Sequence, residues 1–104
     1  MDVTFFNSSI EEFLSSINTD SSAKSYRQIK LLRTFGDKLR MPYSRQISTN
    51  LYELRVHARQ EVRLLYCFYK QKAVILHVFI KKSQKTPKKE ISIAQGRISA
   101  LTTL

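Results

Sequence analysis

Five lysines fall within nine residues of this chain: Lys81, Lys82, Lys85, Lys88 and Lys89. They follow an apolar run, AVILHVFI (residues 73–80), and precede a segment that opens with proline and has the apolar spacing of a helix. A hydrophobic strand that ends in a cluster of cations just before a helix N-terminus concentrates positive potential, which attracts a polyanion. The first partner that this pattern indicates is nucleic acid.

Two arginines and a histidine fall on the polar side of neighbouring runs. Arg55 and His57 alternate with apolar residues along LYELRVH (residues 51–57), and Arg63 stands near the start of VRLLYCFY (residues 62–69). If the turn between the runs makes them antiparallel neighbours, Arg55 and Arg63 can converge on one phosphate through their guanidinium groups. Histidine exchanges protons near neutral pH, so His57 is a candidate for proton transfer.

These residues also have a simpler interpretation. The arginines could form ion pairs with Glu53 or Glu61, and the histidine could be an idle residue at a turn. Runs of lysine are commonly no more than a solvated surface, since long charged side chains are seldom buried. The residues alone leave both interpretations open.

The remaining candidate groups favour packing over chemistry. His77 lies between Leu76 and Val78 and is expected to be a core histidine with a hydrogen-bond partner. Tyrosines in strands can stack a nucleobase but more often pack a core, and this applies to Tyr52, Tyr66 and Tyr69. The two histidines and the single Cys67 do not have the spacing of a zinc site, and the chain has no glycine-rich phosphate-binding motif. We therefore expect no metal and no cofactor.

Length and composition limit the possible classes of protein. A chain of 104 residues, 42% of them hydrophobic, fits one domain over residues 1–104. The formal net charge is +10, and all 18 Lys and Arg residues lie from Lys24 onward. A single cysteine favours a reducing compartment, and the sequence shows neither a bilayer-length apolar stretch nor a signal-peptide pattern. We expect a cytoplasmic protein that neither is secreted nor spans a membrane.

The N-terminal segment has the pattern of a short strand followed by a helix. Val3, Phe5 and Phe6 predict the strand, and Ser8 with Glu11 three residues on has the spacing of a capping box. The helix that starts there carries one apolar stripe, formed by Ile10, Phe13, Leu14 and Ile17.

A second helix is predicted from about Ala23 to Phe35, with Gly36 ending it. Its inward residues are expected to be Tyr26, Ile29, Leu32 and Phe35. The two helices should form a hairpin. The stretch between Asp37 and Asn50, which contains Pro42, is expected to be an irregular connection.

From Leu51 onward the period changes to that of strands. Three consecutive runs, residues 51–57, 62–69 and 73–80, should pair as an antiparallel meander because short polar turns separate them. Pro87, at the first helical position behind Thr86, opens a final helix with the apolar stripe Ile91, Ala94, Ile98 and Leu101. The expected fold class is α+β, with an N-terminal α-helical hairpin and a C-terminal helix packed on a small, curved, mainly antiparallel sheet.

Three segments closely resemble the HigB-type branch of the RelE/ParE toxin superfamily, whose members are often described as phage-derived proteins. They are LYELR (residues 51–55), VRLLY (residues 62–66) and LHVFIKKSQKTPKKEISIA (residues 76–94). The similarity extends over essentially the whole chain, and KKSQKTPKKEI is its most specific part. The resemblance implies a RelE-like fold and the toxin of a type II toxin–antitoxin system, a ribosome-dependent mRNA endonuclease that inhibits translation.

The resemblance also implies roles for individual residues. Such toxins use basic side chains on the concave sheet face, without metal, to cleave RNA through attack of the 2′-hydroxyl on the adjacent phosphate. By position, Arg55, Arg63 and Lys82 are the main catalytic candidates and His57 is a further one, while the RNA-binding candidates are Lys81, Lys85, Lys88 and Lys89. Some relatives carry a C-terminal tyrosine where Ser83–Pro87 has none, so the general base is left unassigned.

The implied partners are mRNA on the ribosome and a small antitoxin, typically with a helix-turn-helix domain. An acidic segment of the antitoxin could cover the Arg55/Arg63/Lys82 face or block access to the ribosome from the side of the helical hairpin. Two other functions compete with this one. A ParE-like toxin would inhibit a topoisomerase with the same fold, and a non-enzymatic nucleic-acid-binding module would need only the net charge of +10.

Overall fold

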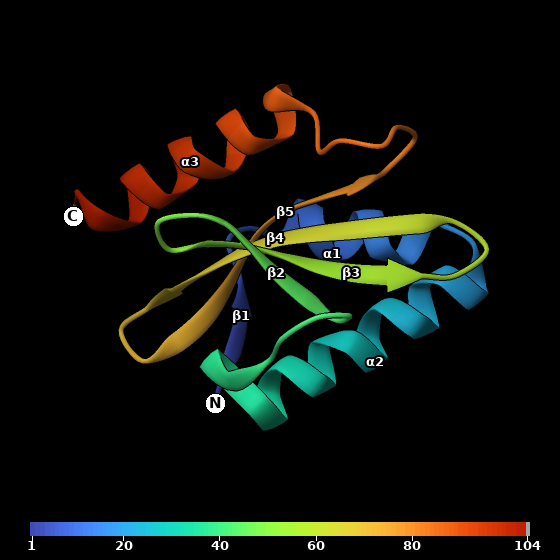
Figure 1. Ribbon diagram of the computed structural model, residues 1–104, viewed down its shortest axis with the longest axis horizontal. Coiled ribbons are helices and arrows are strands. Elements are labelled where there is room, and N and C mark those ends of the chain that lie inside the picture. Colours follow the sequence, from blue (N-terminus) through green and yellow to red (C-terminus); the bar gives the residue numbers. More distant parts are fainter. Residues whose placement is uncertain (104) are drawn as a thin grey trace.

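Strands whose side chains are mostly buried form the centre of the molecule. In the computed structural model, which describes residues 1–103, β3 (Leu51–His57), β4 (Glu61–Tyr69) and β5 (Lys72–Ile80) pair antiparallel in chain order (Figure 1). β2 (Ser44–Ser48) adds antiparallel to β3, and β1 (Val3–Phe5) adds parallel to β5. The five strands follow the order β1-β5-β4-β3-β2, so the predicted antiparallel meander is confirmed.

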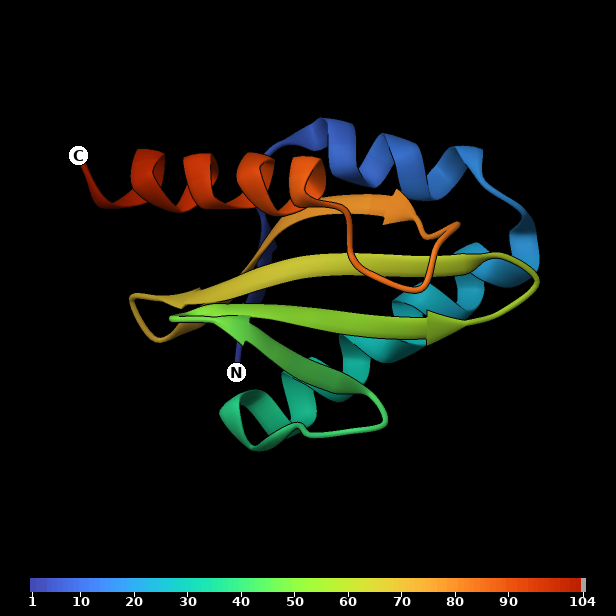
Figure 2. The ribbon, with the colours of Figure 1, turned by 45° about the horizontal axis from the view of Figure 1, so that its top comes forward.

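Three helices cover this sheet from both sides. α1 (Ser8–Ser16) and α2 (Thr19–Phe35) pack into one hydrophobic cluster with the strands, and α3 (Lys88–Thr102) packs into a second cluster. Figures 1 and 2 show α2 and α3 on opposite sides of the sheet. α1 and α2 follow each other closely but diverge from their junction in both views. The fold is α+β, as the sequence predicts.

The strand period of two separates the two clusters. Leu54 and Leu64 are cross-strand partners, and both enter the cluster of α1 and α2. Leu65 and Cys67 point the other way and pack against α3. The register between β4 and β5 shifts at Leu65/Tyr66, and a bulge of this kind bends a sheet and increases its twist.

Both N-terminal helices begin differently from the prediction. The capping box at Ser8 is wrong because Ser8 already lies inside α1, behind Asn7 as the N-cap residue. α2 begins at Thr19 rather than near Ala23, because the side-chain oxygen of Asn18 accepts hydrogen bonds from two backbone N–H groups of the first turn.

The predicted inward face of α2 is only half correct. Ile29 and Leu32 are buried, but Tyr26 and Phe35 are 41% and 51% exposed. The buried stripe instead begins with Ser21 and Ser25, small residues that allow the helix to approach the strands closely. Gly36 does end the helix, with a φ of 56° that suits glycine.

The segment from Asp37 to Asn50 is more ordered than the sequence indicates. It contains part of a short 3-10 helix, η1 (Gly36–Lys38), and the edge strand β2, so its prediction as an irregular connection is wrong. The physical reason is that the edge strand is mostly exposed and polar, and so lacks the apolar alternation of a covered strand.

The C-terminal helix is close to its prediction. Its predicted apolar stripe packs against the second cluster through Ala94, which is buried, and through Ile91, Ile98 and Leu101. Pro87 is the N-cap residue rather than the first helical residue. Within residues 1–103, none of the helices combines the length and the hydropathy that crossing a bilayer requires.

Candidate active site

Arg55 and Arg63 are direct cross-strand partners on β3 and β4, on the sheet face that also carries α3. The helix packs on this face against Leu65 and Cys67 of β4 and Leu76 of β5. Beyond it lies a depression of about 460 Å³, lined by Arg55, Glu61, Arg63, Lys81, Lys82, Ser83 and Gln84. The structure thus brings four of the predicted site residues together, two from the strands and two from the loop after β5.

Arg63 is the buried member of this group, with 3% of the residue exposed. Its Nη1 donates hydrogen bonds to Oε2 of Glu61 at 3.1 Å and to the carbonyl oxygen of Val62 at 3.0 Å. Its Nε lies 3.9 Å from Oε1 of Glu53 and has no hydrogen-bond partner within residues 1–103. The guanidinium is therefore held between two carboxylates, as the simpler interpretation of the sequence allowed.

Glu53 connects Arg63 to the rest of the site. This carboxylate is only 1% exposed and lies 3.3 Å from Nη2 of Arg45 on β2. The hydroxyl of Thr86, in the loop before α3, donates a hydrogen bond to its other oxygen. A buried carboxylate needs such partners, because an uncompensated charge in the interior is costly. Glu53 thus connects β2, β4 and the loop that leads into α3.

His57 lies outside the lining of the depression but is paired with Glu61, which lines it. Its Nδ1 lies 2.8 Å from Oε2 and 3.1 Å from Oε1 of the carboxylate. Burial alone would raise the pKa of Glu61, but hydrogen bonds with His57 and Arg63 outweigh it and lower the pKa below its ordinary value. Glu61 is therefore ionised at neutral pH and can orient the imidazole, which leaves the Nε2 atom for another partner.

The lysines divide into two groups. Lys81 and Lys82 line the depression, and Nζ of Lys81 donates to the carbonyl oxygen of Gln84 at 2.9 Å. Lys85 lies in the following loop, and Lys88 and Lys89 begin α3. These last three lysines are exposed outside the lining of the depression, where they can only extend its positive surface.

Arg55 contacts the segment before β2. Its Nη1 lies 3.5 Å from Sδ of Met41, and its backbone N–H donates to the carbonyl oxygen of Tyr43 at 2.8 Å. No carboxylate within residues 1–103 forms an ion pair with Arg55, in contrast to Arg63. Arg55 is therefore the strand arginine with an exposed guanidinium group.

The groups that the sequence assigns to packing do pack. Nε2 of His77 lies 2.9 Å from Oε1 of Glu90, which joins β5 to α3, so its predicted structural hydrogen bond is confirmed. Tyr66 is buried, with its ring 5.3 Å from that of Tyr52 and its hydroxyl bonded to Ser44. Burial raises the pKa of the Cys67 thiol to about 11, which makes it a poor nucleophile.

Two carboxylates, Glu53 and Glu61, belong to the site although the sequence indicates them only as possible ion-pair partners of the arginines. A signal was present for both, because each shares a strand face with Arg55 or Arg63. The hydrogen bond between Glu53 and Thr86 joins residues far apart in the chain, and strand periodicity cannot predict it.

A mainly antiparallel sheet with three helices and a cationic depression defines an α+β protein with a candidate anion site. Among protein-family models, the one described as Phage derived protein Gp49-like (DUF891) matches residues 12–99. The chain belongs to this family, which is part of the RelE/HigB-like toxin superfamily. A search of curated proteins finds no match.

Proposed function

We propose that this protein is the toxin of a type II toxin–antitoxin system, of the HigB type, and that it acts as a ribosome-dependent mRNA endonuclease. The observation that carries the proposal is the depression where Arg55, Lys81 and Lys82 gather beside the His57–Glu61 pair. The family membership supports a toxin role, since the Gp49-like family is a toxin-like family. Acting on translating ribosomes places the protein in the cytoplasm.

The proposed reaction is attack of a ribose 2′-hydroxyl on the adjacent phosphate. The 2′-oxygen forms a bond to phosphorus, the bond from phosphorus to the 5′-oxygen breaks, and the products carry a 2′,3′-cyclic phosphate and a 5′-hydroxyl. The reaction needs a base for the 2′-hydroxyl proton, cations for the charge on the phosphorane, and a proton donor for the leaving oxygen.

The residues of the depression divide these tasks. Arg55 and Lys82 bind the phosphate oxygens, because their cationic groups lie at the depression and reach solvent. Nε2 of His57 accepts the 2′-hydroxyl proton while Glu61 holds the ring through Nδ1. Lys81 donates a proton to the 5′-oxygen.

Arg63 acts differently from Arg55. Because it is buried between Glu53 and Glu61, it is a positioning residue that fixes the carboxylate behind His57 and contributes positive potential from below the phosphate. The sequence indicates Arg63 as a direct phosphate ligand, and its burial favours this more indirect role.

The ribosome positions the RNA strand, which the depression does not do on its own. The depression is open to solvent, so it holds a flexible RNA strand weakly on its own. Correct positioning of reacting groups is worth about 7–11 kcal/mol in favourable cases, and a message held in the decoding region is already positioned. We therefore expect cleavage of translated messages and survival of free RNA.

The proposal is tested by primer extension on a translated message after induction of the protein in cells. We expect new 5′ ends within the coding region shortly after induction and before growth stops. An intact message in cells whose growth is arrested would contradict the proposal. Accumulation of cleaved DNA–topoisomerase complexes in such cells would favour the ParE-like alternative.

A further inference from the structure

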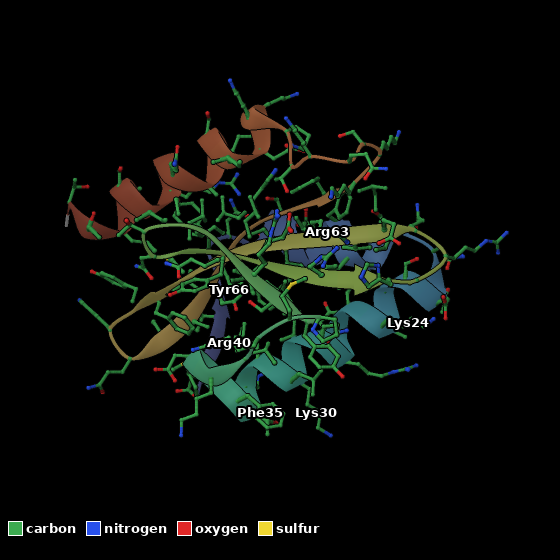
Figure 3. All side chains as sticks on the ribbon, in the orientation of Figure 1. Lys24, Lys30, Phe35, Arg40, Arg63 and Tyr66 are labelled. Carbon is green, nitrogen blue, oxygen red and sulfur yellow. The ribbon has the colours of Figure 1, made fainter. Side chains whose placement is uncertain are left out.

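A smaller hollow lies between the segment that follows α2 and the edge strand β2. It has a volume of about 170 Å³ and is lined by Asp37, Leu39, Arg40, Ser44, Gln46 and Tyr52. We call it the η1 pocket, because its first lining residue, Asp37, belongs to η1. In Figure 3, Arg40 lies between Phe35, at the end of α2, and Tyr66 on the sheet. The η1 pocket shares no lining residue with the depression of the candidate active site.

A row of aromatic rings ends at the η1 pocket. Tyr52 and Tyr66 are cross-strand partners, and their rings stack with 5.3 Å between centroids and 21° between planes. On β2 the cross-strand partner of Tyr52 is Gln46, which has no ring. Because Tyr52 is half-buried and lines the pocket, the row can take one more planar group there. Stacking on an aromatic side chain is a common way to bind a single nucleobase.

The size of the η1 pocket limits its occupant. Pockets that hold drug-sized ligands measure roughly 300–1,000 Å³. At about 170 Å³ the η1 pocket is smaller than these, so it suits a fragment the size of one nucleobase rather than a segment of protein.

Two oppositely charged side chains line the pocket beside the ring. Nη1 of Arg40 donates hydrogen bonds to the carbonyl oxygens of Asp37 at 2.5 Å and of Leu39 at 3.1 Å, which holds the guanidinium against this turn. Among residues 1–103, the carboxylate of Asp37 forms no ion pair, and no hydrogen bond of Arg40 uses Nη2. The pocket therefore offers a ligand one acceptor group and one donor group.

Among the nucleobases, guanine matches these two groups best. An ionised carboxylate only accepts hydrogen bonds, and guanine has two adjacent N–H donors, at N1 and N2, on one edge. Its O6 and N7 atoms accept hydrogen bonds from a guanidinium. Adenine, cytosine and uracil each place an acceptor atom or a C–H group beside their N–H donor, so a carboxylate gains only one bond from them.

We propose that the η1 pocket binds a guanine base, which stacks on Tyr52, donates from N1 and N2 to the carboxylate of Asp37, and accepts at O6 from Arg40. This proposal goes beyond the proposed function and does not rest on it. Two sources share the chemistry, a guanine within an RNA strand and a free guanine nucleotide. The RNA source has a structural link, because Met41, next to Arg40, contacts Arg55 of the depression.

The test measures binding of GMP, IMP and AMP to the intact protein by isothermal titration calorimetry. GMP should bind at least about tenfold more tightly than AMP, and at least about fivefold more tightly than IMP, which lacks the N2 amino group. Asp37→Asn should weaken GMP binding at least about tenfold and remove the preference over IMP. Glu12→Gln, which changes the charge equally at an exposed position of α1, should change the affinity less than about twofold.

The aromatic contact is tested separately. Tyr52→Phe keeps the ring and should bind GMP as the parent does, whereas Tyr52→Leu should weaken binding at least about fivefold. If Tyr52→Leu melts early, Asp37→Asn still decides the outcome, because Asp37 lies at the surface and its carboxylate forms no ion pair within residues 1–103.

A pentanucleotide with 2′-O-methyl riboses and one central guanine separates the two sources. If the guanine belongs to RNA, the pentanucleotide binds more tightly than GMP and loses this gain in Lys82→Ala. If the ligand is a free nucleotide, GMP binds at least as tightly as the pentanucleotide.

Three results would overturn the proposal. They are equal affinities for GMP, IMP and AMP, equal losses in Asp37→Asn and Glu12→Gln, and no binding of GMP or of the pentanucleotide. The assay contains no ribosomes, and the 2′-O-methyl groups prevent attack by a 2′-hydroxyl. Guanine binding without RNA cleavage in any assay would therefore reject the endonuclease and leave the η1 pocket supported.

Discussion

Arg55 and Arg63 stand directly opposite each other on β3 and β4, yet one is partly exposed and the other is buried. Like charges at opposed positions repel, and the carboxylates of Glu53 and Glu61 beside Arg63 offset that repulsion. The pair therefore separates two tasks that sequence analysis assigns to both residues. Arg63 forms ion pairs with both carboxylates of the site, and on the proposed function Arg55 presents its charge to the phosphate.

Replacing Arg63 should affect stability first. Arg63→Ala leaves Glu53 and Glu61 without their shared cation, and breaking a buried ion pair in this way typically costs about 3–5 kcal/mol. Had Arg63 been exposed, its removal would have left stability nearly unchanged. Urea unfolding of Arg63→Ala against Arg55→Ala measures the difference, and equal free energies of unfolding would show that the buried pair does not stabilise the fold.

Replacing the exposed cations should affect the reaction instead. Arg55→Ala and Lys82→Ala each remove a positive group from the phosphate, and loss of one such group typically costs about 10²- to 10³-fold in rate. Their thermal melts should match that of the parent because neither charge is buried. Lys70→Ala, at the β4–β5 turn, is the matched control. Full toxicity and full cleavage in either test variant would remove that residue from the site.

The pair of Glu61 and His57 should give the protein a pH-dependent stability. The folded state lowers the pKa of Glu61 from its ordinary value of 4.5, so its stabilising contribution is complete above that pH and is lost as the pH falls through the lowered value. Glu61→Gln should therefore flatten the decline of stability on acidification. Urea unfolding between pH 3 and pH 7, on the order of one point per pH unit, tests this. An unchanged slope in Glu61→Gln would contradict it.

The sheet was predictable because β3 alternates with a period of two, while β4 and β5 are nearly continuous apolar runs separated by short polar turns. The short turn at residues 58–60 made the opposition of Arg55 and Arg63 predictable as well. β2 was missed because an exposed edge strand carries no such alternation, and the face of α2 was misassigned because Ser21 and Ser25 take buried positions that hydrophobicity does not mark. The burial of Glu53 depends on Thr86, a contact that only tertiary structure creates.

A reconstituted cleavage reaction tests most directly whether the cationic depression cuts mRNA only on the ribosome. A message labelled at its 3′ end is incubated with purified protein, alone and within an initiated ribosome complex, and the new 5′ ends are mapped. We predict fragments with 5′-hydroxyl ends in the ribosome complex and little cleavage of free RNA. With Lys82→Ala, both the cleavage on the ribosome and the residual cleavage of free RNA should be lost. Equal cleavage of free and ribosome-bound message, or an intact message in both, would contradict the account.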